Sequence, residues 1–458
     1  MLLDLTRYSP AAFRREAAKL AVLAMPMLAA QVAQVGVGFV DTVMAGGAGK
    51  DDLAAVALGG STFITVYITF LGIMTALNPM LSQQHGAGET EAVGELGRQG
   101  LWYGLLLGIL GMLLLWLAIA PLQGYLTLNA NVETQFGQYV GFIALAMPAA
   151  MVHRALHAYA SSLGRPKPIM WVSWAALLLN IPLNYIFVYG KLGMPALGGA
   201  GCGLASALVF WFNALALWLY VAKQRYFRPF GLTARFSKPD TAVFGQITRL
   251  GVPIGLSFFL EVSLFTFIML LIARLDGNTE DFVAAQQVVI NITGIIYMIP
   301  QGVGTAATVR VGYSVGANEL YRARYAAGVA VAVGAALAVC TAVLILLLRH
   351  HLVAMYTDDA AVLALGATIL LFAAAFQLAD AVQCIASFAL RGYKVTKLPM
   401  LIHALAFWVL GLGLGCWLAF GREMGIYGFW TALVLSLAAA AVALLWCLET
   451  VSRERAYR

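Results

Sequence analysis

Three acidic residues lie inside stretches of the chain that otherwise read as membrane-spanning helices: Asp41, Glu261 and Asp380. A charged side chain at the centre of a bilayer costs roughly 2.5–3.5 kcal/mol even on mild insertion scales, so such residues usually face a bundle interior and bind something. All three are carboxylates, and no lysine lies deep in a span to neutralise them. An acidic interior therefore indicates cationic ligands: protons, metal ions, organic cations or a combination of these.

Four predicted helices align residues in narrow stripes on one face, three of these stripes contain one of the acids, and the first falls within about 80° of arc. The stripes comprise Gln31, Gln34, Gly38 and Asp41; Phe258, Glu261, Phe265 and Ile268; Gln287, Asn291, Gly294, Tyr297 and Gln301; and Gln377, Asp380, Cys384 and Ser387. For the amides a structural role is the alternative, because interhelical Gln and Asn commonly join transmembrane helices. An ionised carboxylate also needs a cation partner, so a functional interpretation is favoured for the acids.

The depth of each acid in its span separates the three. Glu261 lies near the middle of its predicted helix, and Tyr297 lies near the middle of the next one, so the two should share a level. Asp380 lies toward the cytoplasmic side of that level, and Asp41 lies nearer the external side. Arg154 is the candidate counter-ion in the amino-terminal half, but it lies in the cytoplasmic half of its span, away from Asp41.

The composition identifies an integral membrane protein. Of the 458 residues 62% are apolar and 11% are charged, and apolar stretches long enough to cross a bilayer recur along the chain. We predict an all-α integral membrane fold with about twelve transmembrane helices, at residues 17–44, 53–81, 99–121, 135–163, 168–190, 200–222, 245–273, 282–312, 325–348, 360–390, 399–421 and 425–448. The five cysteines fall within these spans and are interpreted as small core residues.

Basic residues are distributed unevenly over the loops and predict the orientation of the helices. Most of the 28 lysines and arginines fall in the N-terminal segment, the C-terminal tail and alternate loops, among them Arg391 and Lys394 in the turn after the tenth span. Cytoplasmic loops carry such an excess, so both termini should be cytoplasmic. The net charge of +7 follows from this asymmetry, and its spread over short loops argues against nucleic-acid binding.

The chain is an internal duplication. The segment Leu23-Ala24-Met25-Pro26-Met27 is similar to Leu250-Gly251-Val252-Pro253-Ile254, and further similar pairs follow. Six predicted spans form each half, and because six is even, both halves enter the membrane in the same sense, as parallel repeats do. We predict two six-helix lobes, at 1–222 and 245–458, joined by a basic cytoplasmic linker at 223–244. Two lobes that face a central cleft could open it to one side of the membrane and then to the other, which is the alternating-access mechanism of transporters.

None of the three acids is repeated in the other half of the duplicated chain. The positions that correspond to them in the other half hold no acid: Ile268, Gln34 and Val152. This asymmetry favours different functions for the two lobes.

Nothing in the sequence indicates an enzyme. Gly46-Gly47-Ala48-Gly49-Lys50-Asp51 resembles a phosphate loop but lacks the required spacing and the Ser or Thr after the lysine. The sequence also shows no catalytic Ser–His pair and no metal-binding His cluster, and no cofactor is expected.

Motifs in both halves carry a resemblance to a known family. They are Pro26 to Gln31, Gly38 to Gly46, Ala54 to Gly59, Pro253 to Leu256 with Glu261, Ala284 to Gln287, and Met298 to Gly304. With these motifs, and over essentially its whole length, the chain resembles the multidrug and toxic compound extrusion (MATE) transporters, specifically the NorM-type branch. The resemblance implies a twelve-helix, two-lobed exporter that exchanges an inward cation, Na⁺ or H⁺, for organic and mostly cationic drugs.

The resemblance also implies roles for particular residues. Glu261 and Asp380 match the acidic positions held to bind Na⁺ in the carboxy-terminal lobe. Tyr297 matches a tyrosine proposed to contact the ion through its ring face. Asp41 matches the amino-terminal acid implicated in substrate or proton binding.

Further residues are expected at the substrate site. Gln34, Phe265 and Gln287 belong to the polar stripes and should line it. Asp358 and Asp359 fall where some family members have acids that face bound drug, and a solvated loop is the alternative for them. We expect a monomer in the bacterial inner membrane. Its expected partners are small organic cations, Na⁺ or H⁺, and the lipid bilayer. Export of such cations would contribute to antibiotic resistance.

Two other functions share parts of this pattern. A lipid-linked oligosaccharide flippase of the same superfamily would share the duplicated architecture, but it should favour a cationic cavity for pyrophosphate. A channel or receptor would require neither the duplication nor acids at the membrane midplane.

Overall fold

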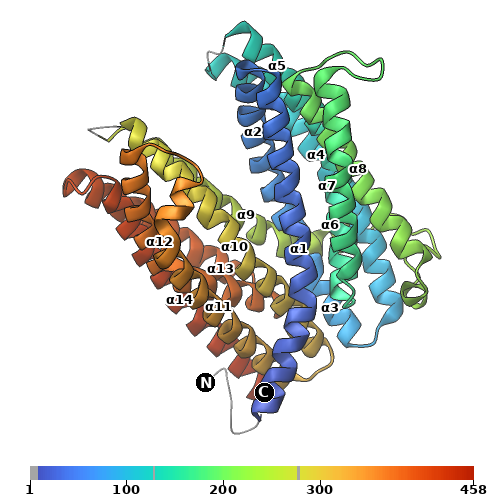
Figure 1. Ribbon diagram of the computed structural model, residues 1–458. Helices are drawn as coiled ribbons and strands as arrows, with labels where there is room; N and C mark the ends of the chain where they lie inside the picture. Colours follow the sequence, from blue (N-terminus) through green and yellow to red (C-terminus); the bar gives the residue numbers. More distant parts are fainter. Residues whose placement is uncertain (1–8, 127–128, 276–278, 458) are drawn as a thin grey trace. The chain divides into compact units, whose positions relative to one another are not determined.

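The described part of the protein, residues 9–126, 129–275 and 279–457 of this computed structural model, is almost entirely helical (Figure 1). The helices are α1 Pro10–Ala48, α2 Lys50–Met74, α3 Leu77–Gly86, α4 Thr90–Leu126, α5 Ala130–Ala144, α6 Ala146–Ser162, α7 Lys167–Tyr189, α8 Gly199–Lys223, η1 Arg225–Phe230, α9 Thr241–Ile272, α10 Thr279–Gly316, α11 Leu320–Ala354, α12 Ala360–Gly392, α13 Lys397–His403, η2 Ala404–Leu414, η3 Trp417–Gly421 and α14 Ile426–Tyr457. Within these residues twelve helical segments are long and apolar enough to cross a membrane, which confirms the predicted number.

Some of these spans consist of successive helices. The span Lys50–Gly86 contains α2 and α3, and the span Ala130–Ser162 contains α5 and α6. In both, the second helix begins two residues before a proline, Pro79 or Pro148. Proline has no N–H to donate to the preceding turn, so the helical ladder is interrupted there. The span Lys397–Gly421 instead widens into π-helical turns after α13.

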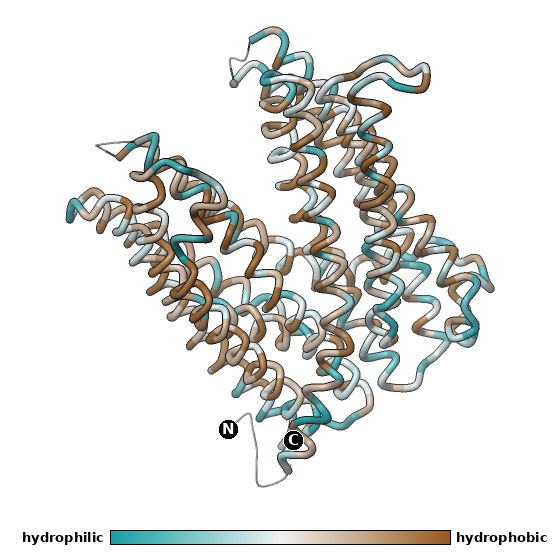
Figure 2. The backbone as a smooth tube through the Cα atoms, in the orientation of Figure 1, coloured by the Kyte–Doolittle hydropathy of each residue, from teal (hydrophilic) through white to brown (hydrophobic). Residues whose placement is uncertain are grey.

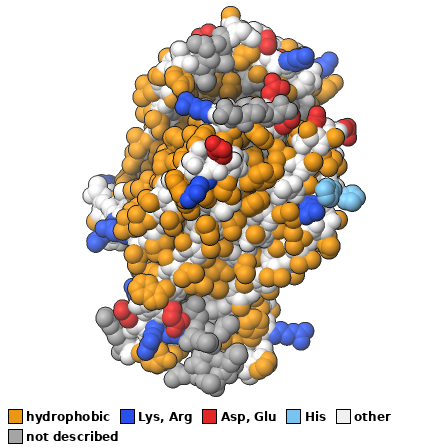
Figure 3. Space-filling view, turned by 90° about the vertical axis from the view of Figure 1, so that its left-hand side faces the viewer, with side chains coloured by type: hydrophobic (Ala, Val, Ile, Leu, Met, Phe, Trp, Pro, Cys, Tyr) orange, Lys and Arg blue, Asp and Glu red, His pale blue; other side chains and the backbone are white. Residues whose placement is uncertain are grey.

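Hydrophobic residues dominate the helices, and hydrophilic residues collect at turns and helix ends (Figure 2). Hydrophobic side chains, drawn in orange, also cover most of the face in view in Figure 3. The spans differ in how much of them is covered by the rest of the protein. In the most apolar 18-residue stretch of Ala130–Ser162, 72% is buried inside the protein, against 17% in the corresponding stretch of Leu320–Ala354. The former is therefore an interior span, and the latter offers its surface to lipid.

The described chain divides into two compact units by its internal contacts. The amino-terminal unit is Met25–Gly255, and the carboxy-terminal unit combines Met1–Ala24 with Leu256–Arg458. Both boundaries fall inside continuous helices, in α1 beside Pro26 and in α9 beside Pro253, which are repeat-related prolines. The first turns of α1 join the carboxy-terminal unit through Glu16, whose carboxylate pairs with Arg310 of α10 at 2.7 Å.

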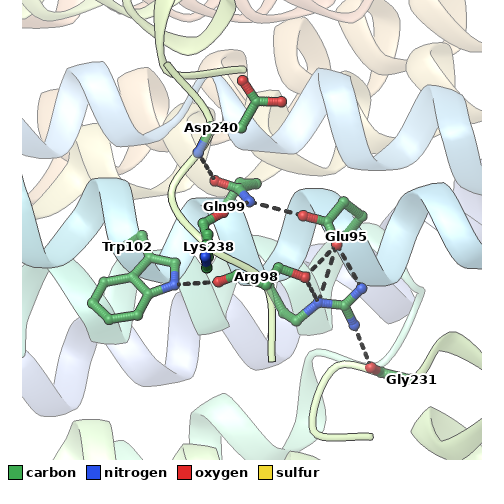
Figure 4. A network of polar contacts seen from close by, with 8 residues as sticks. Glu95, Arg98, Gln99, Trp102, Gly231, Lys238 and Asp240 are labelled. Carbon is green, nitrogen blue, oxygen red and sulfur yellow. Dashed lines mark hydrogen bonds and ion pairs between the residues drawn. The ribbon is translucent and has the colours of Figure 1, made fainter. Parts of the chain in front are cut away.

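The chain between α8 and α9, which makes up most of the expected linker, is held against the start of α4 (Figure 4). Arg98 donates to the carbonyl of Gly231 at 2.5 Å and to the hydroxyl of Ser237 at 2.7 Å. Its guanidinium also pairs with Glu95 at 2.7 Å, and Ser237 donates to the same carboxylate at 2.5 Å. One arginine thus fixes two points of the linker.

The next turn of α4 continues this attachment. Gln99 accepts from the backbone N–H of Asp240 and donates to the carbonyl of Lys238, both at 2.8 Å. Trp102 donates to the carbonyl of Ser237 at 2.9 Å. Backbone groups that would otherwise be solvated are satisfied by α4, so the linker is a part of the amino-terminal unit.

Removing Arg98 should release this segment. In Arg98→Ala the Gly231 carbonyl loses its donor, and we expect trypsin to cleave after Arg235 about tenfold faster, the factor that a loss of ~1.4 kcal/mol in local opening free energy gives. Limited proteolysis of the purified protein, with Arg14→Ala as the control, measures the rate. Equal rates in Arg98→Ala and the wild type would contradict the attachment.

Candidate functional site

Asp41 of α1 is buried among hydrogen-bond donors from α7 and α8. Its Oδ1 accepts from the Nδ2 atoms of Asn184 at 2.7 Å and Asn180 at 3.1 Å. The hydroxyl of Ser206 donates to Oδ2 at 2.5 Å, and the thiol of Cys202 lies 3.4 Å from the backbone carbonyl of Asp41. The aspartate is only 6% exposed. Neutral groups therefore solvate both carboxylate oxygens without neutralising their charge.

The two asparagines are the residues that sequence reasoning missed at this site. Asn180 and Asn184 are four residues apart on α7, so they lie on one face of the helix, and Asn184 also donates to Asn180 at 3.0 Å. Both are 0% exposed. The Oδ1 atom of Asn184 has no hydrogen-bond partner among the described residues. A free acceptor beside a buried carboxylate is suited to a proton donor or a cation.

Close helix packing holds the walls of the Asp41 cluster. Tyr139 of α5 is buried and close enough to Asp41 to interact with it electrostatically. A Cβ atom at Gly59 of α2 would lie 2.3 Å from the Tyr139 ring, and one at Gly203 of α8 would lie 2.7 Å from the Tyr139 carbonyl. Only glycine at these two positions lets α2 and α8 approach α5 so closely. Arg154 is not among the hydrogen-bond partners of Asp41; its electrostatic partner is Tyr67.

The other residues expected at the substrate site are not among the hydrogen-bond partners of Asp41. Gln34 is exposed on α1. Gln287 of α10 is exposed and donates to Asn291 at 3.2 Å. Phe265 of α9 is partly buried against the hydrophobic core of the carboxy-terminal unit.

The two aspartates before α12 differ in their surroundings. Asp359 caps the helix, because its Oδ1 accepts from the backbone N–H groups of Ala361 at 2.8 Å and Val362 at 3.1 Å. Asp358 is exposed. The carboxylate of Asp359 is therefore occupied by the helix terminus, while that of Asp358 faces outward.

The carboxy-terminal unit brings three of the predicted residues together from three helices. The carboxylate of Glu261 in α9 interacts with the hydroxyl of Tyr297 in α10 and with the charge of Asp380 in α12. The thiol of Cys384, one turn after Asp380, also contacts the Tyr297 hydroxyl. Two like charges and a phenol thus converge at one place.

A chain of side chains extends from Asp380 toward α13. Gln383 donates to the carboxylate of Asp380 at 3.1 Å, so its carbonyl oxygen faces His403, 3.0 Å from Nε2. Nε2 must then carry the proton, which makes this nitrogen the donor. The His403 ring stacks on Phe407 with centroids 5.2 Å apart. Asp380 is thereby held in one orientation.

The sequence analysis places Arg391 in the basic turn after the tenth span, but it does not indicate that this residue is buried. It is 4% exposed at the end of α12. Its guanidinium carbon lies 3.9 Å from the ring centre of Phe388 and 4.9 Å from that of Phe258. A planar guanidinium stacks on aromatic faces and is weakly hydrated, which explains the burial. Arg391 also interacts electrostatically with Glu261, so it is a cation partner that sequence reasoning did not find.

The donor set of the carboxy-terminal cluster limits what it can bind. No group of three or more His, Cys, Asp or Glu side chains in the described residues is placed to hold a metal ion. Glu261, Asp380 and Tyr297 supply oxygen atoms, which hard cations prefer over soft ones. The cluster thus fits a small hard cation or protons.

Removing one asparagine should destabilise the Asp41 cluster. Asn184→Ala leaves Oδ1 of Asp41 with one donor fewer, and we expect a loss of about 1–3 kcal/mol in the free energy of unfolding. In an Asp41→Asn background the loss should be smaller, because the charge that needed the donor is gone. Unfolding of the purified protein in mixed micelles measures the loss of unfolding free energy in both backgrounds.

Asn213→Ala is the matched control, since Asn213 of α8 is also buried but makes no hydrogen bond to Asp41. Its effect should be equal in the two backgrounds. Additive effects of Asn184→Ala and Asp41→Asn would show that the two groups do not interact.

Comparisons with known proteins agree with this architecture. The family described as MatE matches residues 26–186 and 253–417. The "Probable multidrug resistance protein NorM" of Neisseria meningitidis serogroup A is 65% identical over 99% of this chain and 98% of the relative. The "Multidrug resistance protein PmpM" of Pseudomonas aeruginosa is 41% identical over 94% of this chain and 91% of its own length. A solved structure of the "MATE transporter NorM-NG" is 61% identical, with a TM-score of 0.82 over 95% of this chain and 94% of that one.

Proposed function

Because the chain belongs to the MATE family and is a multi-pass multidrug efflux transporter rather than an enzyme, we propose that it exports organic cations in exchange for inward Na⁺ or H⁺. The observation that carries this proposal is the presence, at two separate places, of carboxylate charge that neighbouring cations do not fully offset. Asp41 lies in the amino-terminal unit, and Glu261 with Asp380 lies in the carboxy-terminal unit. Two separate acidic sites suit two different cations.

Asp41 is proposed as the substrate acid. A carboxylate solvated by neutral donors attracts a delocalised organic cation by charge, while apolar walls leave the specificity loose. The relatives are named multidrug resistance proteins, which supports a substrate site of such loose specificity. Asn180 and Asn184 hold the acid in place.

Further substrate contacts are proposed for the exposed or partly exposed residues of the polar stripes: Gln34, Phe265 and Gln287. Asp358 is the better candidate of the acidic pair before α12, because Asp359 is engaged in capping that helix. These residues would guide the substrate rather than fix it.

Glu261, Asp380 and Tyr297 are proposed as the coupling-ion site. The carboxylates offer oxygen ligands to Na⁺, and the Tyr297 ring can add a face contact worth up to about 2 kcal/mol when desolvated. The same carboxylates can exchange protons, so Na⁺ and H⁺ would compete for one site. Arg391 lowers the cost of leaving Glu261 ionised when no ion is bound.

Exchange requires that the two sites influence one another. Ion entry should lower the affinity for drug through a shared conformational equilibrium, and the effect must be reciprocal. We propose that this occurs in the inner membrane of a bacterium, as the bacterial relatives suggest. The protein would act as a monomer with both termini on the cytoplasmic side.

Loss of either carboxylate should abolish ion coupling. We expect Glu261→Gln and Asp380→Asn each to remove Na⁺-stimulated efflux of a fluorescent organic cation from proteoliposomes with an imposed Na⁺ gradient. Tyr297→Phe, which keeps the ring, should be milder than Tyr297→Ala. Glu280→Gln, which removes an exposed acid at the start of α10, is the control and should leave coupling intact.

Undiminished Na⁺ stimulation in Glu261→Gln would contradict the assignment of Glu261 to the coupling-ion site. If a variant loses Na⁺ stimulation but retains H⁺ stimulation, Na⁺ binds at this site and H⁺ acts at another one. Size-exclusion profiles of each variant identify those that fail to fold.

A further inference from the structure

A pocket of about 540 Å³ lies outside both acidic sites, at one end of the carboxy-terminal unit. It is lined by Arg324 of α11 and by Glu449, Arg453 and Tyr457 of α14. These two helices pack against one another (Figure 1). Arg324 forms an ion pair with Glu449, so these two charges of the pocket offset one another.

The remaining polar groups of the pocket are cationic or neutral donors. Arg453 is exposed and forms no hydrogen bond or ion pair with any other described residue. The ring of Tyr457 is fixed edge-on against Tyr321 of α11, with centroids 5.4 Å apart. This contact orients the tyrosine while Arg453 supplies an uncompensated charge.

More positive charge adjoins the pocket from the turn between α12 and α13. Tyr393 interacts electrostatically with both Arg324 and Arg455, and the Arg455 guanidinium lies 5.8 Å from the Tyr393 ring centre. Burial lowers the pKa of the neighbouring Lys394 below its ordinary value, and the charge of Arg455 lowers it further. Arg455 therefore lies close enough to Lys394 for the two positive charges to repel one another.

An apolar face leads along α14 to this cationic end. Leu435, Val442 and Trp446 are 51%, 70% and 71% exposed. Their spacing of seven and four residues continues to Arg453 and Tyr457, so all five lie along one side of the helix. A tryptophan between an apolar stripe and a charged end is typical of the boundary between acyl chains and headgroups.

We propose that this pocket binds the phosphate headgroup of an anionic phospholipid, with an acyl chain lying along Leu435, Val442 and Trp446. Guanidinium groups recognise phosphate oxygens by paired hydrogen bonds, and basic pockets between transmembrane helices hold anionic headgroups. The apolar face that continues from the pocket favours a lipid over soluble phosphate, because a free ion would leave that face without a function in binding. The bound lipid bridges α11 and α14.

Lipid binding to the purified full-length protein tests the proposal. Native mass spectrometry in detergent compares phosphatidylglycerol with phosphatidylcholine as probes. We expect the wild type to prefer phosphatidylglycerol by about fivefold or more, and Arg453→Gln to lose that preference. Arg235→Gln, which removes an exposed charge in the segment between α8 and α9, should retain it.

Two results would overturn the proposal. One is an unchanged lipid preference in Arg453→Gln. The other is displacement of phosphatidylglycerol by millimolar inorganic phosphate, which would identify a free anion as the ligand. A Trp446→Ala variant that keeps the headgroup preference but binds phosphatidylglycerol more weakly would support the placement of the acyl chain, and unchanged affinity would contradict it.

Discussion

A carboxylate inside a membrane must be solvated by the protein, because lipid offers it neither hydrogen bonds nor counter-ions. This constraint governs the amino-terminal unit around Asp41. Donors reach the acid from α7 and α8, and α2 and α8 pack closely on α5 because Gly59 and Gly203 leave room for Tyr139. The helices around Asp41 thus supply the hydrogen bonds that its buried carboxylate requires.

The carboxy-terminal unit meets the same constraint with a different set of neighbours. Glu261 and Asp380 interact with a phenol and an amide, and Arg391 adds a buried cation near Glu261. On formal charges, two carboxylates and one guanidinium leave a single negative charge, which suits one monovalent cation. Around Asp41 the hydrogen-bonding partners are all neutral. The difference agrees with the asymmetry of the acids between the two repeats and with separate functions for the two units.

Hydropathy and helical periodicity depend on local spacing alone, so the sequence predicted the twelve spans, the three acids inside them and a common membrane level for Glu261 and Tyr297. It missed Asn180 and Asn184, although their four-residue spacing in an apolar span was a signal. The burial of Arg391 was not predicted, because it depends on Phe258, a residue distant in the sequence. The flippase alternative is not supported, since the relatives are multidrug resistance proteins.

The central claim is that drug and coupling ion occupy separate acidic sites that influence one another. Equilibrium binding of a fluorescent organic cation to the purified protein, titrated with Na⁺, tests it most directly. The account predicts that Na⁺ weakens drug binding in the wild type, that Glu261→Gln keeps drug binding but loses its Na⁺ dependence, and that Asp41→Asn loses drug binding itself. Na⁺ dependence that persists in Glu261→Gln, together with full drug affinity in Asp41→Asn, would contradict it.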